Sequence, residues 1–144
     1  MRLSSGLVCL FLFAPLALRT ALCADVSLGL PGDGGKWVCN PHRIHQLYTN
    51  RSQSCVIMSI GSNNDFGYEE SMQATFGSLC HIHTFDHTVA KPHPPDFVTY
   101  HDVGIAQKRA GKLRSLPELM DLAKAGLSAP HVEILKIDVE GCEF

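Results

Sequence analysis

The stretch CVIMSIGSNND, residues 55–65, decides the fold of this chain. Its first six residues form a nearly continuous apolar run, which is typical of a strand buried on both faces, as in a parallel sheet. The run ends at Gly61 and passes into a polar loop. Tyr68, Met72 and Phe76 follow at a spacing of four residues, which places them on one stripe of a helix, and a glycine after them is a typical helix stop. The sequence therefore predicts a parallel strand, a polar turn and a helix.

Three further short strands are predicted downstream, at residues 81–85, 97–101 and 132–137. Prolines at positions 92, 94 and 95 predict an extended loop between the first two, because proline lacks an N–H and disfavours helix at the residue before it. Ser115 and Glu118 have the spacing of a capping box and predict a helix that stops near Gly126. Strands separated by helical segments indicate an α/β fold with a parallel sheet.

The composition bounds the function classes. The chain has 144 residues and a formal net charge of −2, which suits one domain and gives no global electrostatic case for binding nucleic acid. Neither a phosphate-cradling Gly-Lys-Ser/Thr motif nor a Gly-x-Ser-x-Gly motif is present in the sequence, so P-loop and hydrolase functions lack support.

The N-terminus has the layout of a secretory signal peptide. A positively charged start precedes an uncharged apolar run at residues 7–18, and small residues at 21–24 provide a cleavage site. We expect residues 1–24 to be removed on entry into the secretory pathway, giving a secreted or lumenal protein, and the glycine-rich segment 25–36 to be a flexible lead-in. Twelve apolar residues span about 18 Å of a roughly 30 Å hydrocarbon core, so no stable membrane anchor is expected. A signal-anchored membrane protein is the alternative.

Removal of the leader leaves four cysteines, at positions 39, 55, 80 and 142. In an oxidising compartment they permit two disulfides in three connectivities, of which Cys39–Cys55 is the preferred single bridge. No Cys-x-x-Cys pair is present, and His81 and His83 share a strand face without a third ligand at a fixed spacing, so no metal site is predicted.

The tripeptide Asn50-Arg51-Ser52 has the sequence of an N-glycosylation acceptor for a chain that enters the endoplasmic reticulum. Such tripeptides also occur by chance, so the motif adds only slightly to the secretory interpretation.

Polar residues collect where three predicted strands end: around Gly61, at Asp86, and at Asp138 with Glu140. In open α/β sheets, ligands bind beyond the carboxyl ends of the strands. A glycine after the first strand lets the backbone approach a ligand, and an acidic residue ending the second strand accepts hydrogen bonds from ribose hydroxyls. Asp86 follows Gly61 by 25 residues, near the spacing of a nucleoside-binding unit. The order of these features predicts a nucleoside-cofactor site.

The same residues resemble a known family. SIGSNNDF (59–66), HTFD (83–86) and, most specifically, LKIDVEGCEF (135–144) are similar to FkbM-related, methyltransferase-like proteins. Trp37-Val38-Cys39 before the first strand resembles the secretory-pathway branch of that family. The resemblance covers about residues 37–144 and implies a Rossmann-like class I methyltransferase fold. It further implies binding of S-adenosylmethionine and transfer of its methyl group, often to an oxygen acceptor.

The resemblance also implies roles for individual residues. Gly61 and Asn63 shape the loop under the methionine part of the cofactor, Asp86 holds the ribose hydroxyls, and Asp102 sits beside the adenine. Asp138 and Glu140 are the implied catalytic pair, facing the transfer region where a carboxylate orients or deprotonates an acceptor hydroxyl.

The pattern departs from the family at two positions and in extent. Ser59 stands where relatives often have aspartate, and Asp65 replaces a frequent second glycine. A class I sheet has more strands than the four predicted here, in the order 3-2-1-4, so we expect a fold truncated after the fourth strand, inactive in methyl transfer and without its acceptor contacts. The acceptor substrate is not readable from the sequence.

Two other function classes stay open. A dinucleotide-binding oxidoreductase has the same order of strands and helices. Its first strand is followed by a Gly-x-Gly-x-x-Gly loop, however, and residues 61–63 do not contain one. A non-catalytic or vestigial binding protein would keep the sheet and lose turnover.

Overall fold

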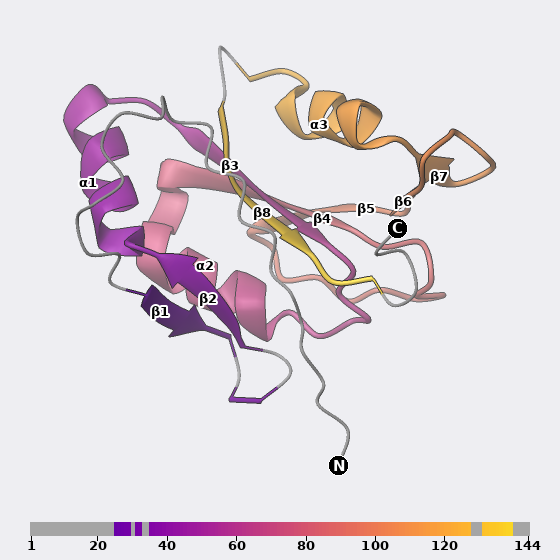
Figure 1. The fold of residues 1–144 in the computed structure, drawn as a ribbon, viewed down its shortest axis with the longest axis horizontal. Helices are drawn as coiled ribbons and strands as arrows, with labels where there is room; N and C mark the ends of the chain where they lie inside the picture. Colours follow the sequence, from indigo (N-terminus) through magenta and orange to yellow (C-terminus); the bar gives the residue numbers. More distant parts are fainter. Residues whose placement is uncertain (1–24, 30, 33–34, 128–130, 140–144) are drawn as a thin grey trace.

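The computed structural model describes residues 25–29, 31–32, 35–127 and 131–139, with a four-stranded parallel sheet at its centre (Figure 1). In spatial order the strands are β5 (Val98–His101), β4 (Cys80–Phe85), β3 (Cys55–Ile60) and β8 (His131–Ile137). This is the expected 3-2-1-4 order of a Rossmann-like methyltransferase sheet. The strand order reverses between β3 and β8, which is where such sheets bind ligands.

Helices cover both faces of the sheet (Figure 1). They are α1 (Pro41–Arg51) and α2 (Gly67–Phe76) on one face, and α3 (Leu116–Lys124) on the other. Side chains of β3 alternate between two cores, because successive strand residues point to opposite faces. Cys55 and Ile57 join the core under α1 and α2, whereas Val56, Met58 and Ile60 join the core under α3. Full burial of each such side chain contributes about 1.5–3 kcal/mol, so the apolar run stabilises both layers.

The predicted helices form for the predicted reasons. Tyr68, Met72 and Phe76 are the buried stripe of α2, which ends at Gly77 and continues as the short 3-10 helix η1 (Gly77–Leu79). Glu118 accepts a 2.9 Å hydrogen bond from the Ser115 backbone N–H, as expected of a capping box at the start of α3.

The segment 25–36 is not the flexible lead-in that the sequence predicts. It contributes β1 (Asp25–Leu28), which pairs antiparallel with β2 (Lys36–Cys39). Leu28 packs against the core under α2, and the Gly29 N–H donates a 3.0 Å hydrogen bond to Ser71 Oγ on α2. Gly29, Gly32 and Gly35 lie in the connection between two short strands, where glycine serves a turn equally well.

The apolar side chains of β2 and α1 divide between core and surface. Val38 and Ile44 are buried, but Trp37 is 63 % exposed and Leu47 is 39 % exposed. Trp37 alternates with Val38 along β2, so the two point to opposite faces of the hairpin.

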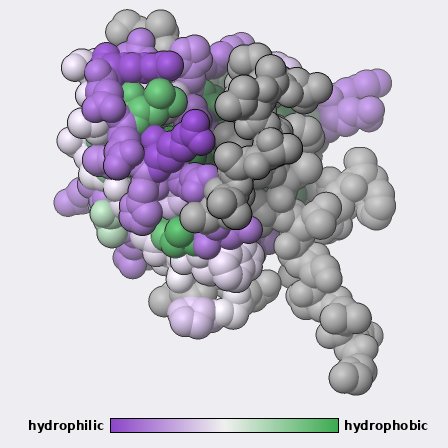
Figure 2. Space-filling view, turned by 60° about the vertical axis from the view of Figure 1, so that its left-hand side comes forward, coloured by the Kyte–Doolittle hydropathy of each residue, from purple (hydrophilic) through white to green (hydrophobic). Residues whose placement is uncertain are grey.

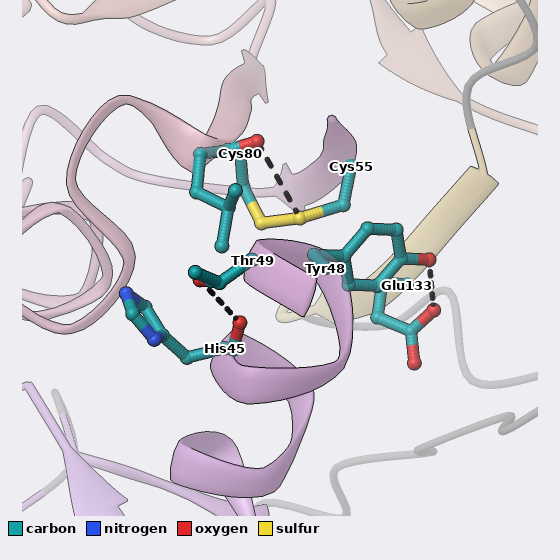
Figure 3. Close-up of a disulfide and its surroundings, with 7 residues drawn as sticks. His45, Tyr48, Thr49, Cys55, Cys80 and Glu133 are labelled. Atoms are coloured by element: carbon teal, nitrogen blue, oxygen red, sulfur yellow. Dashed lines mark hydrogen bonds between the residues drawn. A yellow bond between two sulfur atoms is a disulfide. The ribbon is translucent and has the colours of Figure 1, made fainter. Parts of the chain in front are cut away.

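The preferred Cys39–Cys55 bridge is also wrong, because Cys55 is bonded to Cys80 (Figure 3). The two residues are the first of β3 and β4 and lie opposite each other in the strand register, with Cα atoms 4.4 Å apart. Neighbouring parallel strands begin at the same edge, and this brings the two thiols together. Cys39 is in a disulfide as well, but not with Cys55.

The connection from β4 to β5 contains no helix, as the prolines predicted. Beyond β5 the chain forms a second, unpredicted strand pair, β6 (Gly104–Ile105) and β7 (Leu113–Arg114). Two-residue strands leave no readable periodicity. The predicted leader at residues 1–24 lies outside the described residues, and no described helix has the length and apolar character to cross a membrane.

Candidate functional site

A cleft of about 1210 Å³ lies beyond the carboxyl ends of β3, β4 and β8. Its other walls come from β6, the first residue of β7 and the first turn of α3. Four of the six predicted site residues line this cleft: Gly61, Asn63, Asp86 and Asp138. The strand ends that the sequence marked as a ligand site therefore meet at a cleft.

Gly61 is the point where the three strand ends meet. Its N–H bonds to the Phe85 carbonyl of β4 at 2.9 Å, and the Asp138 N–H bonds to the Ile60 carbonyl at 2.8 Å. Gly61 has a φ of 84°, and a Cβ there would collide with the backbone carbonyl of Asp138. Only glycine satisfies both the dihedral angle and the close approach.

The loop after Gly61 is held in a turn of left-handed residues. Asn63 and Asn64 have φ values of 48° and 62°, a region that asparagine tolerates better than most residues. The Asn64 side-chain oxygen accepts a 2.9 Å hydrogen bond from the His93 N–H, which ties the proline-rich loop to this turn. Asp65 accepts a 3.0 Å hydrogen bond from the Gly67 N–H at the start of α2.

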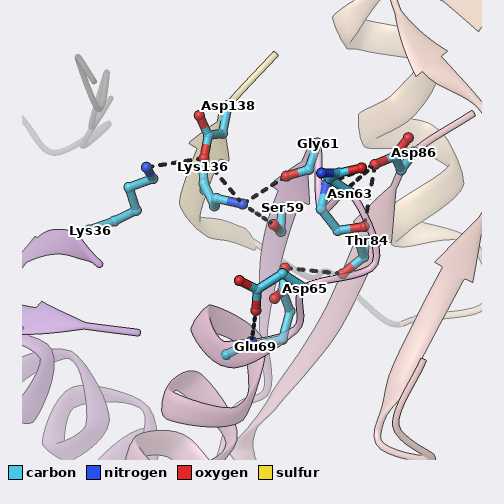
Figure 4. A network of polar contacts seen from close by, with 12 residues as sticks. Lys36, Ser59, Gly61, Asn63, Asp65, Glu69, Thr84, Asp86, Lys136 and Asp138 are labelled. Atoms are coloured by element: carbon cyan, nitrogen blue, oxygen red, sulfur yellow. Dashed lines mark hydrogen bonds and ion pairs between the residues drawn. The ribbon is translucent and has the colours of Figure 1, made fainter. Parts of the chain in front are cut away.

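Asp86 organises this loop from the end of β4 (Figure 4). Its Oδ2 accepts hydrogen bonds from the backbone N–H groups of Ser62 at 2.9 Å and Asn63 at 2.7 Å. Its Oδ1 accepts from the Thr88 N–H at 2.8 Å and the Thr88 hydroxyl at 2.6 Å. Burial on its own would raise the pKa of Asp86, but the hydrogen bonds from Thr88, Asn63 and Ser62 lower it to about 2. The cleft therefore holds an ionised carboxylate at neutral pH.

Two buried lysines surround Asp138 on the opposite wall (Figure 4). Lys36 Nζ forms an ion pair with Asp138 Oδ2 at 3.0 Å, and Lys136 Nζ lies 3.8 Å from the same oxygen. Asp138 is the exposed member, with 44 % of its side chain accessible against 6 % for each lysine. The two lysines thus hold the Asp138 carboxylate at the cleft, and the carboxylate stays accessible to a ligand there.

Lys136 also fixes the glycine turn. Its ammonium donates a 2.8 Å hydrogen bond to the Gly61 carbonyl and one of 3.4 Å to Ser59 Oγ. It lies 5.5 Å from the centre of the Tyr68 ring, within cation–π range. Burial lowers the pKa of Lys136, and the nearby carboxylates of Glu69 and Asp138 oppose that shift.

Sequence reasoning missed Lys36, Lys136 and Glu69. Lys36 comes from the hairpin that was interpreted as a lead-in, and Lys136 stands inside an apparently apolar strand. Glu69 is fully buried on α2, where Thr84 donates a 3.4 Å hydrogen bond to Oε1 and, among the described residues, Oε2 has no hydrogen-bond partner. A charged residue within an apolar strand pattern was the available signal for Lys136.

Two predicted site residues do not join the group. Asp102 is exposed and forms an ion pair with Lys112 at 2.5 Å, outside the cleft. The cleft is lined instead by Gly104, Ile105 and Gln107, a few residues further along. Glu140 lies outside the described residues.

His83, one of the two histidines considered for a metal site, pairs with His101 away from the cleft. His83 Nδ1 lies 2.9 Å from His101 Nε2, and the His101 ring stacks on Phe85 with ring centres 4.4 Å apart. Burial, and then the neighbouring His101, lower the pKa of His83 to about 4. Within the described part of the chain, no three His, Cys, Asp or Glu side chains are grouped as a metal site would need.

Comparison with known proteins agrees with this geometry. A family described as a methyltransferase domain matches residues 20–144, which includes every strand and helix named above. Searches of curated proteins and of solved structures gave no significant match. The Rossmann-like sheet, the cleft at its switch point and this match over most of the sequence lead to one conclusion: the chain belongs to this family of methyltransferase domains.

Proposed function

We propose that the cleft binds S-adenosylmethionine for transfer of its methyl group to an oxygen acceptor, and that the 144 residues on their own bind the cofactor without turnover. The observation that carries the proposal is the meeting of Gly61 and the ionised Asp86 at the carboxyl edge of the sheet. This combination of a backbone approach and a ribose-binding carboxylate is the nucleoside-site arrangement of Rossmann-like sheets.

The residues present fit the cofactor in size and charge. A volume of about 1210 Å³ exceeds the 300–1,000 Å³ usual for small-molecule pockets, so it leaves space for part of an acceptor beside the cofactor. In the described part of the chain, Asp65, Asp86 and Asp138 line the cleft together with one lysine, Lys136. This acidic bias favours a ligand that carries a sulfonium cation.

The two oxygens of Asp86 have different tasks in this proposal. Oδ2 stays with the loop amides of Ser62 and Asn63, which have no other orientation available. Oδ1 accepts a bond from the Thr88 hydroxyl, whose proton can rotate away and leave that oxygen for the ribose hydroxyls. Thr88 is exposed and lines the cleft, so it can yield this place without repacking the core.

The adenine has an apolar wall in place of Asp102. Ile105 and Leu116 line the cleft while packing against the core under α3, and the Gln107 amide offers hydrogen bonds beside them. A flat apolar slot with one polar group is a usual environment for a ring that must be oriented.

The chemistry needs an activated methyl group and a positioned acceptor. When bound, S-adenosylmethionine supplies the methyl group on a sulfonium. Asp138, fixed by Lys36, accepts a hydrogen bond from the acceptor hydroxyl and takes its proton as the oxygen reacts. Lys136 holds the Gly61 carbonyl and so keeps the turn in place.

Two finer points belong to the same proposal. We place the protein in the FkbM-related branch on the motifs at 59–66 and 135–144, and in the secretory pathway on its N-terminal pattern. The Cys55–Cys80 disulfide supports the second point, because structural disulfides persist chiefly in oxidising compartments.

The test is calorimetric titration of the protein with S-adenosylmethionine and, separately, with NAD. Binding of the first and not the second supports the proposal, whereas the reverse supports an oxidoreductase. Transfer of labelled methyl groups to hydroxyl-bearing acceptors then separates an enzyme from a non-catalytic binding protein. Asp138→Asn is the matched variant: it should still bind the cofactor, with lower affinity because a negative charge is lost from the cleft, and it should abolish any transfer that wild type shows.

A further inference from the structure

We propose that Asn50 carries an N-linked oligosaccharide at the end of the molecule opposite the cleft. Asn50-Arg51-Ser52 is the one Asn-x-Ser/Thr sequence in the chain with a residue other than proline in the middle. This inference does not depend on the methyl-transfer reaction.

The acceptor side chain is exposed. Asn50 lies in the last turn of α1, and residues 49–53 are all exposed. Tyr48, two residues earlier, is 4 % exposed and donates a 2.6 Å hydrogen bond to Glu133 (Figure 3). Two residues along a helix turn the direction of the side chain by roughly 200°, so the contact that holds Tyr48 inward directs Asn50 outward.

The helix ends within the tripeptide. Ser52 is the C-cap, with a φ of 50°, and its N–H bonds to the Thr49 carbonyl at 3.2 Å. Asn50 and Ser52 therefore stand at an exposed turn, and a bulky group on Asn50 displaces no packed side chain.

The chemistry of the same segment fits the compartment in which glycans are attached. Cys55 follows Ser52 by three residues and is bonded to Cys80. In Figure 3 the last turn of α1 lies beside this bridge. Disulfide formation and N-glycosylation both take place in the endoplasmic reticulum, so two features a few residues apart indicate the same route.

The position leaves the cleft open. The chain passes from α1 into the first residues of β3, while the cleft begins at the other end of that strand, roughly 16 Å away. Where grey atoms do not cover it, the α1 side that comes forward in Figure 2 is mostly hydrophilic with scattered apolar residues. Such a surface favours a hydrated glycan over a protein contact.

The modification is a group transfer from a lipid-pyrophosphate-linked oligosaccharide. A bond forms between Asn50 Nδ2 and the anomeric carbon of the first sugar, and the bond from that carbon to the pyrophosphate oxygen breaks. The amide loses one proton, and the lipid pyrophosphate leaves with the electron pair.

The experiment expresses the full 144-residue chain in mammalian cells and treats it with peptide-N-glycosidase F in ¹⁸O water. We expect one shift in electrophoretic mobility and conversion of Asn50 to ¹⁸O-labelled aspartate in the tryptic peptide. Asn50→Gln and Ser52→Ala should lose the shift, Ser52→Thr should keep it, and Thr49→Ala is the neighbouring control that should also keep it.

Several results would overturn the proposal. They are an unmodified wild-type chain, a shift that persists in Asn50→Gln, and a wild-type chain that is modified only when a foreign secretory leader replaces residues 1–24. The last result would show that Asn50 is accessible but that the protein's own N-terminus does not bring it to the compartment that holds the oligosaccharide donor.

Discussion

The Asn63 backbone amide donates a 2.7 Å hydrogen bond to Asp86 Oδ2, so the loop after β3 and the end of β4 form one unit. The Ser62 amide shares the same oxygen at 2.9 Å. The residue expected to hold a ribose therefore also shapes the loop expected to lie under the methionine part. Loss of Asp86 should affect both functions.

Asp86→Asn tests the cofactor role with the least disturbance of the loop. An amide oxygen can still accept from Ser62 and Asn63, but the charged acceptor is lost, and charge-assisted bonds contribute about 1.5–3 kcal/mol each. We expect at least a tenfold loss of S-adenosylmethionine affinity by calorimetry. Thr88→Val, which removes the competing hydroxyl, should bind as tightly as wild type or more tightly. Weaker binding in Thr88→Val would mean that Thr88 contacts the ligand itself.

Gly61→Ala should destabilise the fold through a collision as well as through its dihedral angle. Gly77 provides the control, since it also has a positive φ but a Cβ there meets no atom within 4 Å. Gly77→Ala should cost about 1–3 kcal/mol, because its φ of 56° with a ψ of −137° lies in a region that essentially only glycine adopts. Gly61→Ala should cost about 1–3 kcal/mol more, because the Asp138 backbone must move. Urea unfolding of the two variants measures the difference, and equal losses would contradict the close approach.

The fold and the position of the cleft were predictable because they rest on patterns of many residues. The run at 55–60 and the stripe at Tyr68, Met72 and Phe76 signal burial, and parallel strands bring their carboxyl ends to one edge. The hairpin was missed because its glycines read equally as turn or lead-in. Consequently Lys36, which is the ion-pair partner of Asp138, was missed too.

The bridge and the position of Asp102 depend on details that a sequence does not encode locally. Cys55 and Cys80 meet because β3 and β4 are neighbours in register, a tertiary fact. Asp102 turns out to pair with Lys112, ten residues away, across a strand pair too short to be recognised from periodicity.

Stability should fall between pH 6.5 and pH 4, mainly because of His83 and in the same direction because of its neighbour His101, whose pKa burial also lowers. Burial lowers the pKa of His83 to about 4 in the fold, whereas an unfolded histidine binds its proton near 6.5. Below pH 6.5 the unfolded state therefore binds more protons, and stability present above that value is lost down to about pH 4, by up to about 3 kcal/mol. Asp86 acts at lower pH. Because the fold lowers its pKa from 3.8 to about 2, the stability that it contributes is lost as the pH drops from about 3.8 to about 2.

Urea unfolding at pH 7.0 and pH 4.5 measures the His83 effect. His83→Gln, which cannot take up a proton, should lose much less stability than wild type between these two pH values. An equal loss in the two proteins would show that His83 is not the group responsible.

The Cys55–Cys80 bridge should contribute about 3–4 kcal/mol, since it closes a loop with a sequence separation of 25 and restricts the unfolded chain. The double variant Cys55→Ala/Cys80→Ala should unfold at correspondingly lower urea concentration than oxidised wild type. Mild reduction should lower the stability of wild type and leave that of the variant less affected. A double variant as stable as the oxidised protein would show that the bridge does not stabilise the fold.

The most direct measurement is a backbone-amide NMR titration of the protein with S-adenosylmethionine. The account predicts saturable shifts for the amides of Ser62, Asn63 and Thr88 and for the cleft segment 104–107, with the amides of His83 and Thr99 unchanged. Absence of shifts at saturating ligand, or shifts centred on the His83–His101 pair, would contradict a cofactor site at the carboxyl edge of the sheet.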